Sequence, residues 1–227
     1  MADTPRQLPL ELPHEEALGR DDYLVGSANQ AAFELLERWP DWPSPVVILA
    51  GPVGAGKTHL VKAWHEDAGA AVISAADLTS DAVTGLVACG AVAVEDAHNG
   101  VDETALFHLL NAARQADIRV LITSRTWPNA WNLKLPDLMS RLRAATPVEI
   151  AEPDDDLLRL VLVKLFADRQ LAVDPGVVDY LVVRMERSLG VACRVVEEID
   201  RAALAGRVKI TKPLAGRVLE DVQNGAD

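Results

Sequence analysis

The sequence predicts an α/β protein: a phosphate-binding α/β subdomain with a parallel sheet flanked by helices, followed by a small all-helical subdomain. Three observations lead to this fold class. Short continuous apolar runs alternate with helical apolar periods, a glycine-rich loop follows the first of these runs directly, and the strand signals stop after Pro153. Continuous apolar strands that alternate with helices are typical of a parallel sheet covered on both faces.

The α/β part is expected to open with a helix near Asn29, which a proline-rich stretch ends. Four strands are then expected, because short runs are apolar and rich in β-branched residues at 46–50, 70–74, 91–95 and 119–123. Crossover helices are expected where apolar residues recur at intervals of three and four, at 57–68 and 102–116.

Three further helical patterns follow Pro153, at 154–170, 174–187 and 190–204. The first part of the chain is instead rich in proline and charge and has no helical period, which is typical of an exposed tail. The sequence therefore predicts a flexible tail over 1–20, a nucleotide-binding α/β subdomain over 21–152 and a helical lid subdomain over 153–227.

Composition narrows the classes of function. The 227 residues are 49% hydrophobic and 25% charged, which excludes disorder along the whole chain. Lys and Arg total 22 against 34 Asp and Glu, so the net charge is −12, the wrong sign for a chain that mainly grips nucleic-acid phosphates. No apolar run reaches the roughly 20 residues that cross a bilayer, and no secretion signal opens the sequence. A cytoplasmic protein without membrane partners is expected, with Cys89 and Cys193 as small core residues.

The strongest chemical signal is a phosphate-binding loop (P-loop). Residues 51–58 match G-x-x-x-x-G-K-(S/T), after a predicted strand and before a predicted helix. Glycines let backbone N–H groups turn toward phosphates, Lys57 reaches the β- and γ-phosphates, and the Thr58 hydroxyl can hold Mg²⁺. The predicted nucleotide-binding residues here are Gly51, Pro52, Val53, Gly54, Ala55, Gly56, Lys57, Thr58 and His59.

A second acidic element is expected beside this loop. Glu95 and Asp96 end the predicted strand at 91–95, and a parallel sheet delivers its strand ends to the ligand edge. We predict that Glu95 holds Mg²⁺ together with Thr58, and that Asp96 polarises water. The alternative is a pair of solvated acids at a strand end.

These residues resemble the AAA+ ATPases, and within them the replication initiator DnaA and its shorter relatives of the Hda type. Residues 23–29 resemble the family's adenine-side element F-x-x-G-x-x-N, which adds Leu24 and Val25 to the nucleotide site. Thr123 stands where the family has its sensor 1 residue, 135–142 resembles the arginine-finger element, and 190–195 resembles the sensor 2 segment. The resemblance implies an AAA+ P-loop domain with a helical lid, and ADP or ATP with Mg²⁺ as cofactors.

The resemblance also gives roles to two arginines. Arg141 is expected to reach the γ-phosphate of a neighbouring subunit's nucleotide, unless it only pairs with Asp137. Arg194 is expected to reach the phosphates bound by its own chain, unless it pairs with Glu197 or Glu198. Two departures from the family predict slow intrinsic hydrolysis: Glu95-Asp96 replaces two aspartates, and Arg125 stands where the family commonly has Asp.

The N-terminal tail contains Gln7-Leu8-Pro9-Leu10-Glu11-Leu12, which resembles the Q-L-x-L-x-L peptide of proteins that bind the bacterial sliding clamp. An extended peptide can place Leu10 and Leu12 in a hydrophobic groove while the Gln7 amide makes directional hydrogen bonds, and Leu8 completes the motif. The alternative is a tail that folds back on the domain.

Hda-type function is therefore expected: a regulator of replication initiation that binds adenine nucleotide and the sliding clamp and stimulates hydrolysis of DnaA-bound ATP. The expected partners are the clamp and DnaA, with a possible homo-oligomer. Sequence-specific DNA binding is not expected, because no basic recognition helix follows the third predicted lid helix. A helicase-loader-like protein and a stand-alone ATPase remain the alternatives.

Overall fold

The computed structural model describes residues 19–225. Five parallel strands form one sheet in the order β2-β3-β4-β1-β5. Four of them confirm the predicted strands: β1 (Val46–Ala50), β2 (Ala71–Ser74), β3 (Ala91–Glu95) and β4 (Arg119–Ser124). The fifth, β5 (Thr146–Glu149), was not predicted, because its sequence TPVE has a proline and no continuous apolar run. As an edge strand it pairs only with β1, so a proline is tolerated there.

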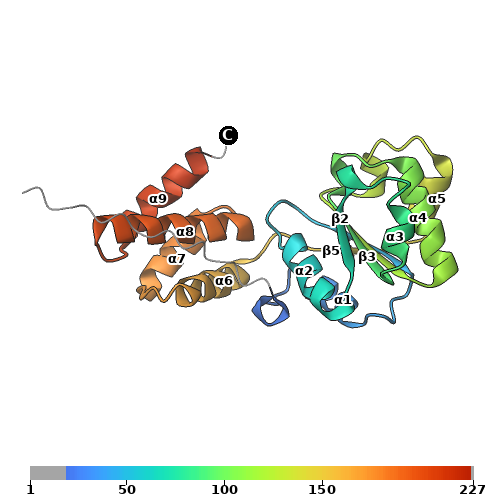
Figure 1. The fold of residues 1–227 in the computed structure, drawn as a ribbon. Helices are drawn as coiled ribbons and strands as arrows, with labels where there is room; N and C mark the ends of the chain where they lie inside the picture. Colours follow the sequence, from blue (N-terminus) through green and yellow to red (C-terminus); the bar gives the residue numbers. More distant parts are fainter. Residues whose placement is uncertain (1–18, 226–227) are drawn as a thin grey trace, which may run out of the picture.

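Helices cover both faces of the sheet, as a parallel sheet requires. Alternate residues of β1 point to opposite sides: Val46 and Ile48 belong to one core cluster, whereas Val47 and Leu49 belong to another. The first cluster lies under α3 (Val83–Val87), α4 (Glu103–Ala116) and α5 (Pro136–Arg143). The second lies under α1 (Gln30–Glu37) and α2 (Lys57–Ala68), on the other face in Figure 1.

The C-terminal helices form a group with its own core, which we call the helical region (residues 155–224). It comprises α6 (Asp155–Asp168), α7 (Pro175–Arg184), α8 (Leu189–Gly206) and α9 (Lys212–Asn224). A separate apolar cluster joins these four helices, and Figure 1 shows them as a body beside the sheet. The predicted boundary near residue 153 falls in the connection between β5 and α6.

The sequence prediction of three helices after Pro153 was wrong by one, since α9 is a fourth. Pro213 stands in its first turn, where a missing N–H costs no hydrogen bond, and Leu214, Ala215, Val218 and Leu219 are buried. Gly216 and the proline weaken the apparent period of this segment. A Cβ on Gly216 would lie 2.7 Å from the Tyr180 hydroxyl oxygen, so α9 packs very closely against α7.

The prediction that both cysteines are core residues was also wrong. Cys89 is exposed beyond α3, and Cys193 is half-buried on α8. Within residues 19–225, no helix has the length and apolarity needed to cross a membrane. The predicted clamp-binding peptide, with Gln7, Leu8, Leu10 and Leu12, lies outside the described residues.

Candidate nucleotide-binding site

A cavity of about 410 Å³ lies between the P-loop and the helical region, a size that suits a small ligand. Its lining combines residues from the α/β part with residues of α6 and α8. From the α/β part come Asp22, Tyr23, Leu24, Val53, Gly54, Gly56, Lys57, Thr58, His59, Lys62, Asp96 and Arg125. From the helical region come Val161, Lys164, Leu165, Asp168, Arg169, Leu189, Gly190 and Cys193.

The P-loop runs from the end of β1 to the start of α2 at Lys57. Gly54 and Gly56 have φ values of +70° and +95°, a left-handed conformation that L side chains rarely adopt. A Cβ on Gly51 would lie 2.5 Å from the Ile150 carbonyl oxygen, so only glycine fits beside the chain that leaves β5. Backbone conformation and steric space therefore explain why glycine is required at these three positions. The loop ends at a helix N-terminus, which favours bound anions.

Lys57 is buried, with 8% of the residue exposed. Its Nζ donates to the carbonyl oxygens of Gly51 and Pro52, at 2.7 Å each. Burial lowers the pKa of the Lys57 ammonium, and the Arg125 charge lowers it further, whereas Asp96 and Glu95 raise it. An ammonium has three donors and two are used here, so a phosphate oxygen fits the third. The residues present thus fit a nucleotide phosphate.

The two residues predicted to hold a metal are neighbours in the structure. A hydrogen bond with the Thr58 side chain lowers the pKa of the partly buried Glu95, but burial is the larger influence and raises that pKa. Among residues 19–225, no group of three or more His, Cys, Asp and Glu side chains could hold a metal ion. Glu95 and Thr58 would therefore hold Mg²⁺ only together with ligands that the nucleotide itself provides, as is usual for Mg²⁺ at phosphates.

Asp96 and Thr123 connect the ends of two neighbouring strands. Asp96 follows β3 with a φ of +61°, lines the cavity, and donates its backbone N–H to Thr123 Oγ1 at 3.1 Å. Thr123 is 1% exposed and is not among the cavity-lining residues. In this structure Thr123 therefore fixes the backbone that presents Asp96, and its predicted catalytic role stays a prediction.

The other end of the cavity contains Tyr23, Leu24 and His59. Tyr23 stacks on Phe33 and packs edge-on against His59, with ring centroids 5.7 and 5.0 Å apart. Burial raises the pKa of Tyr23 and lowers the pKa of His59. Asn29 fixes this segment, because its amide group accepts from the Gly26 N–H and donates to the Leu24 carbonyl oxygen. Val25 is 40% exposed and does not line the cavity.

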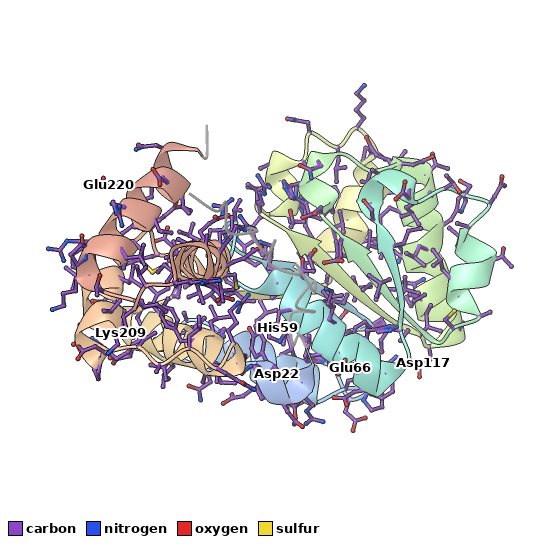
Figure 2. All side chains as sticks on the ribbon, turned by 60° about the vertical axis from the view of Figure 1, so that its left-hand side comes forward. Asp22, His59, Glu66, Asp117, Lys209 and Glu220 are labelled. Atoms are coloured by element: carbon purple, nitrogen blue, oxygen red, sulfur yellow. The ribbon has the colours of Figure 1, made fainter. Side chains whose placement is uncertain are left out.

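The helical region contributes side chains that sequence reasoning missed. Lys164 on α6 pairs with Asp22 at 2.8 Å, which ties α6 to the segment before α1, and with Asp168 of its own helix at 2.7 Å. Figure 2 shows Asp22 and His59 at this junction. The Leu189 N–H at the start of α8 donates to the Gly54 carbonyl oxygen at 2.8 Å. No signal in one sequence links residues more than 100 positions apart, so these contacts were not predictable from it.

The two arginines assigned by resemblance lie outside the cavity lining. Arg194 is exposed on α8, whereas Gly190 and Cys193 of the same helix line the cavity. The alternative, an ion pair of Arg194 with Glu197 or Glu198, is not seen in the described chain either, because both glutamates pair with Arg201. Arg141 is half-buried in the last turn of α5 and has no ion pair with Asp137 in the described chain. Both assigned roles stay predictions.

Comparison with known proteins finds similarity in sequence and in fold. The sequence matches no protein-family profile. It is 21% identical over 196 residues to the chromosomal replication initiator protein DnaA of Cutibacterium acnes, covering 74% of this chain and 39% of that protein. The chain thus spans about two fifths of the length of this curated relative.

Solved structures agree on the fold. Domain III of the Thermotoga maritima replication initiation protein DnaA superposes with a TM-score of 0.77 at 17% identity, over 93% of this chain and 99% of that one. AMPPCP-bound DnaA from Aquifex aeolicus superposes with a TM-score of 0.66 at 22% identity, over 84% of this chain and 66% of that one. A Thermotoga maritima RuvB mutant superposes with a TM-score of 0.70 at 16% identity, over 89% of this chain and 71% of that one.

The parallel sheet, the P-loop at the end of β1 and the C-terminal helices define the class as an AAA+ fold. Within this class, the sequence match and the superposition on domain III both show similarity to DnaA. The chain has an AAA+ fold and resembles DnaA in sequence.

Proposed function

We propose that this protein is a regulator of replication initiation that binds ADP or ATP with Mg²⁺, binds the sliding clamp, and stimulates hydrolysis of DnaA-bound ATP. The observation that carries the proposal is the cavity itself, because Lys57, Thr58 and the P-loop glycines meet there next to Asp96. Similar solved structures add support, since two of them are DnaA bound to AMPPCP.

The position of α5 supports action on a neighbour. Leu138 and Leu142 are buried in the core of the α/β part, which fixes the helix against the sheet. Arg141 lies between them in sequence, half-buried and away from the chain's own cavity. A guanidinium held on a rigid helix outside its own site is suited to stabilise charge that develops in a partner's site. The Hda-type role of the chain rests on this residue and on the tail peptide.

Slow intrinsic hydrolysis is part of the proposal. A bound nucleotide would supply phosphate ligands for Mg²⁺. The P-loop and Lys57 would hold the phosphates, and Thr58 and Glu95 would hold the metal. Burial favours the protonated form of Glu95, which opposes its use as a metal ligand. Asp96 is exposed and its backbone is fixed by Thr123, so its carboxylate faces solvent. This arrangement supports retention of nucleotide more than rapid turnover.

The test uses the full chain, DnaA loaded with ATP, and clamp loaded on DNA, with the ADP fraction on DnaA followed over time. An arginine finger acting in trans contributes roughly 10³- to 10⁵-fold in well-studied cases, so Arg141→Ala should remove the stimulation. The affinity of the Arg141→Ala variant for ADP should stay at the wild-type level, because Arg141 lies outside the cavity. Capture of the variant by immobilised clamp should also stay unchanged.

Two further arms separate the parts of the proposal. Replacing Gln7 and Leu8 together by Ala should abolish capture by the clamp and the stimulation, while ADP affinity stays unchanged. Arg143→Ala is the matched control on the same helix turn. If Arg141→Ala stimulates as well as wild type and Arg143→Ala does not, the finger is Arg143. If wild-type protein does not accelerate hydrolysis on DnaA, the regulator hypothesis is refuted and the helicase-loader-like or stand-alone ATPase alternative takes its place.

A further inference from the structure

The charge of the chain is unevenly distributed, and one stretch of the helical region is strongly basic. Residues 201–217 contain five Lys and Arg and no Asp or Glu, although the whole chain has a net charge of −12. We call these residues the basic segment. It runs from the end of α8 through the connecting turn into α9. A run of like charges in an acidic chain suits a partner of the opposite sign.

Most of this positive charge is not neutralised within the described chain. Arg201 pairs with Glu197 at 3.1 Å and with Glu198 at 2.5 Å. The other four basic residues are exposed and have no ion pair among residues 19–225: Arg207, Lys209, Lys212 and Arg217. Unpaired charges of one sign in a short segment repel one another, and an anionic partner relieves that repulsion.

The basic segment forms the tip of the helical region. Arg207 is the C-cap of α8 with a φ of +49°, and this left-handed residue reverses the chain toward α9. The Val208 N–H donates to the Ala203 carbonyl oxygen at 3.1 Å, which closes the turn. In Figure 1, α8 runs away from the sheet, so the turn lies at the end of the helical region far from the α/β part. Figure 2 shows Lys209 at this outer edge.

The packing around Lys212 leaves its charge available. A Cβ on Gly176 would lie 3.1 Å from Lys212 Nζ, so the lysine side chain extends along the first turn of α7. The Asp174 carboxylate also lies against Gly176, but it accepts from the Gly176 N–H at 2.8 Å and so caps α7. The carboxylate that shares this glycine with Lys212 is thus used by a helix N-terminus and not by the ammonium.

The composition of the basic segment favours DNA over a lipid surface or a small anion. DNA carries one negative charge per about 1.7 Å of helix axis, so it offers phosphates to cations spread along a chain segment. The segment has no Trp or Phe to anchor it at a lipid interface, and its exposed large apolar side chains are Leu204 and Val208. None of its residues lines the cavity, where a small anion would be enclosed.

We propose that the basic segment binds the phosphate backbone of double-stranded DNA without sequence preference, through Arg207, Lys209, Lys212 and Arg217. Backbone contacts of this kind position a protein on a duplex and read no sequence. The surface is separate from the nucleotide site and from α5, because the turn lies at the opposite end of the molecule in Figure 1. The inference goes beyond the proposed function: a protein held by the clamp would meet the DNA on which the clamp is loaded, and this surface would contact it.

The test measures binding of the full chain to two labelled duplexes of unrelated sequence by fluorescence anisotropy, without nucleotide, clamp or DnaA. The logarithm of the association constant should fall against the logarithm of the salt concentration with a slope of about −3.6, at about −0.9 for each of four neutralised phosphates. Both duplexes should give the same slope and the same affinity. Arg207→Gln, Lys212→Gln and Arg217→Gln should each weaken binding about eightfold at about 0.1 M salt and reduce the slope by about 0.9.

Arg114→Gln is the matched control, an exposed arginine in the last turn of α4 whose loss changes the net charge equally. It should leave the DNA affinity unchanged. Arg207→Lys keeps the charge and should bind both duplexes as wild type does. The melting temperatures of the basic-segment variants should stay at the wild-type value, because the substituted side chains are exposed.

Three results would overturn the proposal: no binding to either duplex at low salt, a preference for one duplex, or a loss in Arg114→Gln as large as in the basic-segment variants. Vesicles of phosphatidylglycerol and phosphatidylcholine are a second probe. If the wild-type protein binds these vesicles and not DNA, and the basic-segment variants lose that binding, the surface belongs to lipid and the proposal is wrong. None of these results concerns nucleotide binding or the stimulation of DnaA, so the proposed function is tested separately.

Discussion

The two ends of the cavity are built in different ways. The phosphate end consists of backbone and side chains that follow the ends of β1, β3 and β4, strands that the hydrogen bonds of the sheet hold together. The opposite end consists of side chains from the segment before α1, from His59 of α2 and from α6, joined by the Lys164–Asp22 ion pair and by ring packing. The sheet fixes the geometry of the phosphate end. The geometry of the opposite end depends on how the helical region packs against the α/β part.

This difference teaches which part of the site determines binding and which part adjusts it. A sheet edge is rigid, because each strand is fixed by its neighbours, so the phosphate end is preorganised. Ion pairs with partly exposed partners are weak individually, and side-chain exposures of 23% for Lys164 and 30% for Asp22 put this pair among them. We therefore expect large losses from changes at the phosphate end and small ones at the junction.

Lys57→Ala should have the largest effect on nucleotide affinity. The variant removes the buried ammonium that the Gly51 and Pro52 carbonyl oxygens hold at the P-loop, where the proposed phosphates bind. Loss of a charged group from a desolvated site costs about 100-fold in affinity, for ADP and ATP alike. Isothermal titration measures both affinities, and a melting experiment should show that ADP no longer raises the melting temperature. A variant that ADP stabilises as much as wild type would contradict the assigned role.

The sequence predicted the phosphate end well because its signal is local. Eight consecutive residues specify the P-loop, and the strand that precedes it and the helix that follows are each visible from their own apolar pattern. The contribution of His59 was predicted because it follows this motif directly. Asp96 was predicted at the same edge for a related reason, since parallel strands deliver their ends to one side.

The sequence predicted the opposite end poorly because its contacts are not local. Lys164 and Asp168 are ordinary charges on an amphipathic helix until the fold brings α6 beside Asp22. Cys193 looked like a small core residue, although its helix turns it toward the cavity. Arg194 is expected at the phosphates from the resemblance, whereas in this structure α8 presents Gly190 and Cys193 to the cavity and Arg194 stays a prediction. Neither periodicity nor motif shows which helix face meets a distant loop.

Lys164→Ala should weaken nucleotide binding modestly, by about fivefold, if the junction only adjusts the site. The variant removes the ion pair with Asp22 that ties α6 to the segment carrying Tyr23 and Leu24, and with it the Asp168 pair within α6. Partly exposed pairs contribute up to about 1 kcal/mol, which corresponds to roughly a fivefold change in affinity. Lys209→Ala is the matched control, an exposed lysine of the helical region far from the junction in Figure 2. A loss as large as that of Lys57→Ala would show that the junction determines binding as strongly as the sheet edge.

The smallest expected effect concerns Glu95, the phosphate-end residue whose burial works against its charge. Burial is the largest influence on its pKa and raises it; the Thr58 hydrogen bond lowers it, the Asp96 charge raises it, and Lys62 and Lys57 lower it. A carboxyl group with a raised pKa in the folded state favours folding at pH values below its unfolded pKa, and that contribution is lost as the pH rises through the folded value. Ionised Glu95 therefore destabilises the nucleotide-free protein at neutral pH.

Glu95→Gln should accordingly raise the melting temperature of the nucleotide-free protein at pH 7 by about 2 °C, because the amide keeps the shape and carries no charge. The gain should shrink as the pH falls toward about 4, where wild-type Glu95 is itself protonated. The same variant should lose Mg²⁺-dependent tightening of ATP binding, since an amide is a weaker metal ligand than a carboxylate. Melting curves across this pH range, without nucleotide and with Mg²⁺-ATP, measure both effects. A variant that melts lower than wild type at pH 7 would mean that the ionised carboxylate stabilises the sheet edge, and that the phosphate end is held by charge as well as by backbone.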